Sequence, residues 1–189
     1  LYNESAPSIF VTARLGKTTS MFRDEARGAN AVYSSLISFL VAAEVVNDLV
    51  VDGPNLEKPI VFAAFAGEEY DLVGSKRMME EFPGLVDTVV EIGPVGFASS
   101  SKDALYVHEQ YNQTDDTFED FLKVQSAANR ETLGEDSLSV KEVSRGVEVP
   151  KGSSLNSFTN VSGSRLTLTD YNTFESDDPF YGTMFDSGL

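Results

Sequence analysis

Two adjacent carboxylates, Glu68 and Glu69, follow an apolar run at residues 59–66 and are the side chains best placed for chemistry. A carboxylate can bind a metal ion or take a proton from a metal-bound water. A site with two metal ions needs about five or six nitrogen and oxygen ligands, including imidazoles. The sequence has one histidine, His108, and no cysteine. These residues therefore predict that the carboxylate pair does not hold two metal ions.

Apolar periodicity predicts the elements that position these carboxylates. Short apolar runs are typical of strands that are buried on both faces of a sheet, and apolar residues at every third or fourth position are typical of helices. Turn residues such as the Pro and Gly at positions 83 and 84 predict where helices end. The predicted strands are residues 8–15, 59–66, 86–92, 104–107 and 166–169, and the predicted helices are residues 29–51, 72–82 and 115–130.

The alternation of strands and helices indicates the fold class. Such alternation favours right-handed crossovers and a mostly parallel sheet with helices on both faces. We therefore expect an α/β fold, a three-layer αβα sandwich, formed as a single domain over residues 1–189. The segments predicted to be surface loops are residues 99–102, 134–139 and 150–154.

The charge of the chain excludes one class of partner. The sequence has 30 acidic and 14 basic residues and a net charge of −16, which repels phosphate backbones, so nucleic acid is not expected as a partner. The most apolar long segment, residues 29–51, is interrupted by polar residues such as Glu44 and Asp48, and we expect no membrane span. The first residues lack a signal-peptide pattern and an initiator Met, which indicates a fragment of a longer protein.

Several polar residues follow predicted strands and should meet at one edge of the sheet. In open parallel sheets, ligands bind at the carboxyl ends of the strands. Glu68 and Glu69 lie at such an end, and so do Arg14, Glu91 and Asp170. We interpret Arg14 as a salt-bridge partner of Glu68 or Glu69, with a substrate contact as the alternative.

The functional interpretation of each candidate competes with a structural one. Glu68 and Glu69 could stabilise a helix amino terminus, or Glu68 could attract a free peptide amino terminus through a charge-assisted hydrogen bond. His108 has no second imidazole or cysteine to join it, and we interpret it as an ordinary strand-edge residue. Both interpretations of the glutamates remain open at the level of sequence.

Three Asn-x-Ser/Thr triplets are candidate glycosylation sites. They lie at Asn3, Asn112 and Asn160, and none has Pro in its middle position. About one or two such triplets would arise by chance in this composition, so the excess is slight. The triplets favour a protein of the secretory pathway.

An ordered set of motifs resembles a known family. The segments at residues 11–15, 28–30 and 67–75 occur in the chain order of the di-zinc aminopeptidases. Together with the segments at residues 89–93 and 154–163, they resemble more closely the nicastrin family, whose members are the large glycoprotein subunit of γ-secretase. The resemblance covers about residues 8–186, and the ordered set is much more specific than any single motif.

Compared position by position with active aminopeptidases, the resemblance implies that metal ligands are missing. Arg14 and Gly16 stand where active members have the His and Asp of the first-strand motif, and Ala31 replaces the Asp that bridges the metals. The final His is missing from residues 174–186. A guanidinium does not bind a metal ion and repels a dication.

Other matched positions keep their carboxylates. Glu68 matches the general base, Glu69 matches a ligand, and Glu91 takes the place of a ligand Asp. The resemblance implies a protein with no catalytic residues and no metal cofactor. The alternative is an active zinc metalloaminopeptidase with an altered metal site.

The resemblance also implies partners and a location. Nicastrins act with presenilin, the catalytic subunit, and with the other γ-secretase subunits, and they receive or sterically screen the amino termini of membrane-protein stubs. The location implied is the lumenal or extracellular side of the ER, Golgi and plasma membranes, as part of a single-pass membrane protein. A scaffold that only supports its complex is a further alternative. The implied substrate-binding residues are Glu68, Asp71, Ser75 and Arg14, with Leu72 in place of the family's Tyr.

Overall fold

A computed structural model describes residues 7–16, 29–51, 53, 56–96, 104–109, 139–143, 149 and 152–172. The helix predicted at residues 115–130 and the loop predicted at residues 99–102 lie outside these residues, as do residues 174–186. So do the candidate glycosylation sites Asn3 and Asn112, whereas Asn160 lies within them.

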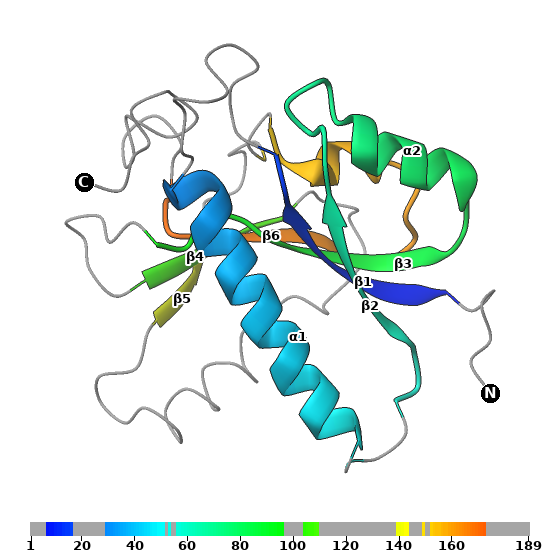
Figure 1. Cartoon of the computed structure of the whole chain (residues 1–189), viewed down its shortest axis with the longest axis horizontal. Helices are drawn as coiled ribbons and strands as arrows, with labels where there is room; N and C mark the ends of the chain where they lie inside the picture. The colour runs from blue at the N-terminus through cyan, green and yellow to red at the C-terminus, as the bar shows by residue number, and fades with distance from the viewer. Residues whose placement is uncertain are drawn as a thin grey trace.

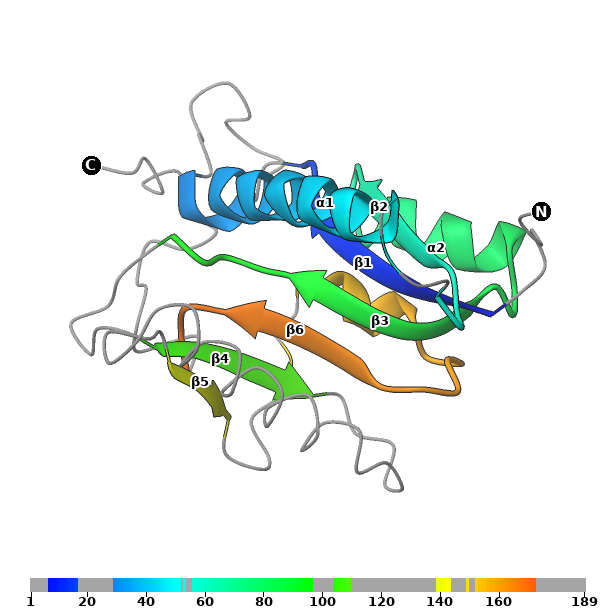
Figure 2. The same cartoon turned by 90° about the horizontal axis from the view of Figure 1, so that it is seen from below.

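In these residues, six strands form one sheet in the order β2-β1-β3-β6-β4-β5 (Figures 1 and 2). β1 pairs in parallel with β2 and β3, and β3 pairs in parallel with β6. β4 is antiparallel to β6 and parallel to β5. The mostly parallel sheet predicted from sequence is therefore confirmed. The strands are β1 (Ser8–Arg14), β2 (Ile60–Phe65), β3 (Val86–Ile92), β4 (Ala104–Glu109), β5 (Ser139–Glu142) and β6 (Arg165–Thr169).

Helix α1 (Ser35–Val51) covers one face of the sheet, and a short π-helical turn, η1 (Ala29–Ser34), leads into it. Phe39 is the buried centre of its contact with the strands, and Leu36 and Ala42 pack beside it. The Phe39 and Phe62 rings meet edge to face with centroids 5.4 Å apart, a geometry that aromatic pairs favour. Burial of these apolar side chains holds α1 against β1, β2 and β3.

The segment Val32–Val51 is long and apolar enough to cross a membrane by length and composition alone, with a mean hydropathy of 1.7. Only 11% of this segment is buried. In the fold, the segment forms the crossover between the parallel strands β1 and β2. Parallel neighbours require such a crossover, and it is usually a helix.

Helix α2 (Val73–Glu81) and the 3₁₀ turn η3 (Ser154–Ser157) cover the opposite face (Figure 1). Side chains alternate along a strand, so Phe10 and Val89 face this layer. Val11 is one residue and Ile92 three residues further along its strand, and both pack with α1. The largest core cluster joins strand residues to Leu155 and residues that follow η3. Two covered faces make the three-layer αβα sandwich, and the predicted fold class is confirmed.

Two elements were not predicted. β5 has the sequence Ser-Val-Lys-Glu, which is too short and too polar to produce an apolar run. It pairs with β4 along its whole length, so pairing rather than local propensity defines it. The turn η3 begins in a segment that sequence assigned to a loop, residues 150–154.

Candidate functional site

A row of polar side chains crosses the middle of the sheet on the face that η3 covers. Thr12 of β1 pairs with Glu91 of β3, Glu91 pairs with Thr167 of β6, and Thr167 pairs with His108 of β4. Each of the four is at most 2% exposed. Since neighbouring strands lie about 4.8 Å apart, Thr167 separates Glu91 from His108. The row places one carboxylate at the centre of the sheet.

Glu91 is held by hydrogen bonds to the segment around η3. Its Oε1 accepts a bond of 3.0 Å from the Ser154 amide, and its Oε2 accepts one from the Ser153 hydroxyl. Burial raises the pKa of the Glu91 carboxyl, while these two bonds and the charge of Arg14 oppose the rise, and the charge of Glu68 adds to it. The Glu91 carboxyl therefore holds its proton to a higher pH in the folded protein than it would in water.

Glu68 lies at the carboxyl end of β2 and is 3% exposed. Its Oε1 accepts a bond of 2.9 Å from the amide of Ser75, the third residue of α2. Its Oε2 accepts bonds of 2.8 Å from the Ser75 hydroxyl and 2.6 Å from the Ser154 hydroxyl. Glu68 thus satisfies an amide at the start of α2 that has no partner within the helix. This is the helix-terminus role that we weighed for the glutamate pair.

The chain between Glu68 and α2 has a conformation that brings the carboxylate back to the helix. Gly67 has φ of +79°, and Asp71 and Leu72 have φ of 61° and 60°. Left-handed residues are uncommon outside Gly, and two in succession make a tight reversal. A Cβ at Gly74 would collide with the carbonyl oxygen of Ala66. Gly74 therefore permits the close approach of α2 to the end of β2.

The serines of η3 join the two carboxylates. Ser154 donates its amide to Glu91 and its hydroxyl to Glu68. The Ser157 hydroxyl lies 2.8 Å from the Ser75 hydroxyl, which itself donates to Glu68. Sequence reasoning missed Ser153 and Ser154, which it assigned to the loop at residues 150–154, and Ser157, which follows that loop. Three serines within five residues, opposite two strand-end carboxylates, were the available signal.

Arg14 ends β1 and is only 7% exposed. The ion pair that we expected with Glu68 or Glu69 is not formed, because none of the salt bridges among the described residues includes Arg14. Its charge acts instead on Glu91, and its guanidinium lies against Gly152, where a Cβ would come within 2.9 Å of Nη1. Among the described residues, its Nε has no hydrogen-bond partner. Arg14 is thus a buried cation that interacts with the charge of Glu91 without forming an ion pair.

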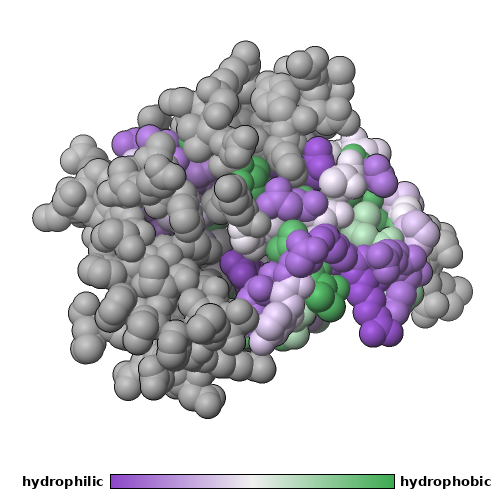
Figure 3. Space-filling view, turned by 90° about the horizontal axis from the view of Figure 1, so that it is seen from above, coloured by the Kyte–Doolittle hydropathy of each residue, from purple (hydrophilic) through white to green (hydrophobic). Residues whose placement is uncertain are grey.

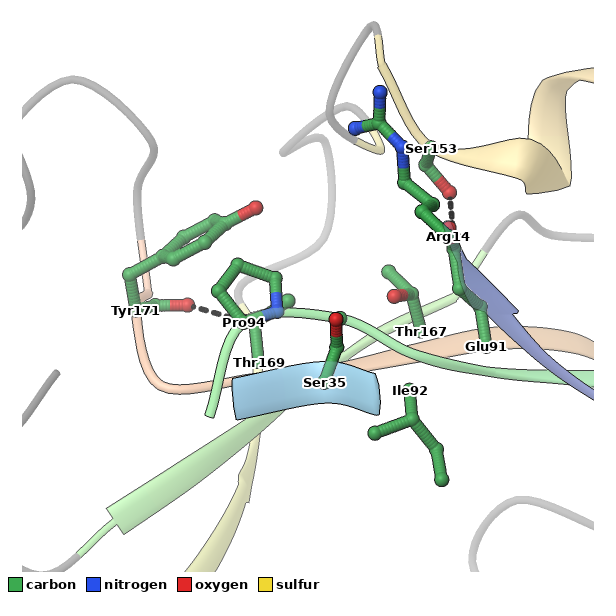
Figure 4. A pocket seen from close by; sticks show the side chains of 10 residues that line it. Arg14, Ser35, Glu91, Ile92, Pro94, Ser153, Thr167, Thr169 and Tyr171 are labelled. Atoms are coloured by element: carbon green, nitrogen blue, oxygen red, sulfur yellow. Dashed lines mark hydrogen bonds between the residues drawn. The ribbon is translucent and has the colours of Figure 1, made fainter. Parts of the chain in front are cut away.

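A small cavity lies beside Arg14 and Glu91 (Figure 4). Its volume is about 10 Å³, which is room for a single water molecule. Ser153 and Thr167 contribute hydroxyls to its wall, and Tyr171 closes it from the end of β6. A cavity of this size does not admit a peptide side chain.

The remaining predicted residues separate into buried and exposed ones. Ser75 is fully buried and contacts Glu68. The Asp71 side chain is 90% exposed and pairs with Lys76 at 2.7 Å, so the structure does not bring it to Glu68. Glu69 lies against Gly16, where any Cβ would collide with its carboxylate. Glu68, Ser75 and Arg14 therefore share one buried region, and Asp71 lies at its outside.

The interpretation of His108 as a strand-edge residue was wrong. β4 lies between β6 and β5, and His108 is 2% exposed. Its Nε2 lies 2.9 Å from the Thr169 hydroxyl and 3.0 Å from the Tyr171 carbonyl oxygen. Since a carbonyl only accepts, Nε2 carries the proton. Burial lowers the pKa of His108, and the bond to Tyr171 opposes this. In the sequence, the position of His108 within an apolar strand was the signal that it is buried.

A larger hollow lies between α2 and the turn that follows η3. It has a volume of about 370 Å³ and is lined by residues that include Lys76, Met79, Asn156, Ser157 and Asn160. On the side of the molecule shown in Figure 3, hydrophilic and hydrophobic residues are interspersed over the described surface. Ser157 belongs both to this hollow and to the hydrogen-bond network of Glu68.

Comparison with known proteins identifies the family. A family model described as the nicastrin large lobe matches residues 7–188. The chain belongs to the nicastrin family. Nicastrin of Arabidopsis thaliana is 35% identical over 106 residues, and nicastrin of Homo sapiens is 32% identical over 108 residues. These matches cover 50% and 53% of this chain but 15% of each relative's length, so the chain spans a small part of the relatives it matches.

Solved structures show the same fold. A crystal structure of the γ-secretase component nicastrin matches 97% of this chain and 36% of its own, with a TM-score of 0.69 and 20% identity. A zinc aminopeptidase from Bacillus subtilis matches 99% of this chain and 42% of its own, with a TM-score of 0.64 and 22% identity. The motif resemblance to nicastrin and the aminopeptidase-like fold are both confirmed.

The residues that the structure describes do not form a site for zinc like that of the aminopeptidase that shares the fold. Among the residues that the structure describes, no group of three or more His, Cys, Asp or Glu side chains could hold a metal ion. Glu68 and Glu91 direct their oxygens to serine donors, and Arg14 brings a positive charge close to Glu91. His108 directs Nε2 to Thr169 and Tyr171.

Proposed function

We propose that this chain is a non-catalytic, aminopeptidase-like domain of a γ-secretase component, which recruits and sterically screens membrane-protein stubs. The observation that carries the proposal is that amide and hydroxyl donors of the protein bind both carboxylate oxygens of Glu68 and of Glu91. Membership of the nicastrin family supports the same assembly for this chain. Presenilin and the other γ-secretase subunits are its proposed partners.

The hydrogen bonds at Glu68 explain why the domain would not hydrolyse peptides. A general base must reach the water whose proton it removes. Glu68 instead accepts bonds from the Ser75 amide and from two serine hydroxyls, and it is almost fully buried. The resemblance puts Arg14 at the position of a metal-ligand His of active aminopeptidases, and a guanidinium cannot act as a ligand and repels a dication.

Recruitment would use the same carboxylate in a different way. A peptide ammonium donates three hydrogen bonds and forms charge-assisted ones with a carboxylate. We propose that η3 moves away from Glu68 and that the amino terminus of a stub then replaces the Ser154 hydroxyl, while Ser75 keeps the carboxylate in position. Asp71, which is exposed beyond Ser75, is the proposed outer contact. Arg14 would donate a hydrogen bond to a substrate carbonyl only if the segment at Gly152 moved.

The proposed location is the lumenal or extracellular side of the ER, Golgi and plasma membranes, in a single-pass membrane protein. The acidic surface, with a net charge of −16, suits a partner that arrives as a free amino terminus. The exposed Asn160, in its Asn-x-Ser triplet, supports the secretory pathway.

Replacement of Glu68 by Gln tests the recruitment step. Glu68→Gln should weaken binding of a peptide with a free amino terminus by about 10- to 150-fold, since a charge-assisted hydrogen bond contributes about 1.5–3 kcal/mol. Binding of the same peptide with an acetylated amino terminus should not change. The exposed Glu57→Gln is a matched control that keeps the net charge equal. Unaltered binding of the free peptide by Glu68→Gln would refute capture at this carboxylate.

Two further measurements separate the alternatives. Zinc analysis together with a chromogenic aminoacyl substrate should give no stoichiometric zinc and no turnover. Two bound zinc ions with turnover would establish an active metalloaminopeptidase with an altered site. If changes at Glu68 or Asp71 reduce complex assembly and leave stub capture intact, the domain is a scaffold.

A further inference from the structure

The outward side of α1 carries a ridge of exposed apolar side chains. We define the α1 ridge as Tyr33, Ile37, Val41, Val45 and Leu49, which repeat at every fourth position. Their exposed fractions lie between 51% and 67%. Residues four apart in a helix lie one above the other, so the ridge is a continuous stripe along η1 and α1.

The ridge is additional to the side of α1 that already packs on the sheet. Leu36, Phe39 and Ala42 fill the contact with the strands. Figure 2 shows α1 in front of the strands with no described element covering it. A surface helix normally has one apolar stripe and a polar opposite face, whereas a helix that is apolar on both sides is typical of burial between two layers.

Acidic residues border the ridge. Glu44 and Asp48 are both exposed and are separated by one helical turn, a like-charge spacing that is unfavourable in isolation. Residues 35–51 contain no Lys or Arg. The chemistry that would complete this surface is an apolar stripe flanked by basic side chains.

Charge decides between the candidate occupants. A second copy of this chain would bring another net charge of −16 to an acidic border, and like charges oppose such an interface. An anionic lipid surface attracts helices with Lys and Arg on their polar face, which α1 lacks. A helix of another protein segment with Lys or Arg beside its apolar stripe suits both features.

We propose that the α1 ridge is an internal packing surface for such a basic-flanked amphipathic helix, supplied in cis by polypeptide outside residues 1–189. The chain covers 36% of the solved nicastrin chain whose fold it shares, so relatives contain additional polypeptide that could supply a further layer. Ridges formed by every fourth residue are those that pack into the grooves of a second helix. This inference does not depend on the proposed function.

The first test measures access to the ridge in the protein at its natural length. Val45→Cys should react with a maleimide at least about tenfold more slowly than Arg77→Cys, because a covered thiol reacts only through local opening. Arg77 lies on α2 with its side chain 75% exposed, which makes it the accessible control. Peptide mapping by mass spectrometry reads each position separately. Equal labelling rates would overturn the proposal.

The second test identifies what covers the ridge. A photoreactive benzophenone amino acid in place of Tyr33 preserves an aromatic ring at a ridge position. Irradiation should crosslink it to a segment of the same polypeptide, outside residues 1–189, that has Lys or Arg beside apolar residues. A crosslink to a segment within residues 1–189, to a second copy, to another subunit or to lipid would overturn the proposal.

Discussion

Glu91 shows how hydrogen-bond donors and a nearby charge can accommodate a carboxylate in the interior of a sheet. The two bonds from Ser153 and Ser154 replace part of the solvation that burial removes, and Arg14 supplies an opposite charge without direct contact. A buried charge without such partners would be far more costly. The raised pKa of Glu91 shows that desolvation still exceeds these compensations.

The raised pKa of Glu91 predicts a pH dependence of stability. The folded state keeps the Glu91 proton where the unfolded chain has released it, so its contribution is complete below the ordinary pKa and is lost as pH rises through the folded value. Glu91→Gln keeps an acceptor for Ser154 but does not titrate. In urea unfolding between about pH 4 and pH 8, the free energy of unfolding of the variant should rise relative to that of the parent as pH rises. If the difference in free energy of unfolding between variant and parent does not change with pH, the raised pKa of Glu91 is contradicted.

His108 predicts the opposite slope. Its pKa is lowered by burial, so its contribution is present above its ordinary value, about 6.5, and is lost as pH falls through the folded value. His108→Gln keeps a side-chain N–H for Tyr171 and does not titrate. In the same unfolding series, the free energy of unfolding of His108→Gln should rise relative to that of the parent as pH falls below about 6.5. If both variants shift the slope in the same direction, one assignment is wrong.

At the scale of elements, η3 makes the largest contribution to the site, although it is only four residues long. It reaches both carboxylates through Ser154 and contacts Ser75 through Ser157. It also anchors Leu155 and Phe158 in the largest core cluster. Hydrophobic burial therefore fixes η3 at a place where its serines meet the strand ends.

Removal of one hydroxyl tests this role. Ser154→Ala should lower the free energy of unfolding by about 1–3 kcal/mol, because Glu68 loses a donor in a buried place. Ser162→Ala removes an exposed hydroxyl bond to Asp87 and should change stability by no more than about 0.5 kcal/mol. Urea unfolding of both variants makes the comparison. Equal effects would show that the network at Glu68 contributes little.

The sequence predicted the strands and helices that have strong apolar periods, and it placed Glu68, Arg14 and Glu91 at strand ends. It did not predict β5, since four residues with two charges produce no pattern. It also could not show that Glu68 and Glu91 turn towards serines, because Ser154 follows Glu68 by 86 residues. Contacts at that separation depend on packing of the whole fold rather than on local pattern.

At the scale of the whole molecule, Asn160 predicts the compartment. It is exposed on the turn after η3, so an oligosaccharide could be attached without disturbing the core. When the protein is expressed through the secretory pathway, Asn160→Gln should remove one glycan, seen as a mass difference that glycosidase treatment abolishes. Ser162→Ala removes the triplet while keeping the asparagine and should have the same effect. Unchanged mass in both variants would contradict modification at this position.

The two edge strands of the described sheet, β5 and β2, differ in length and composition. β5 is short and carries Lys141, features that discourage a strand from pairing with foreign chains. β2 ends the other side with six uncharged residues, Ile-Val-Phe-Ala-Ala-Phe, the composition of segments that form fibrils. Residues 1–189 on their own should therefore tend to aggregate through β2, and solubility should improve wherever another strand or a loop covers that edge.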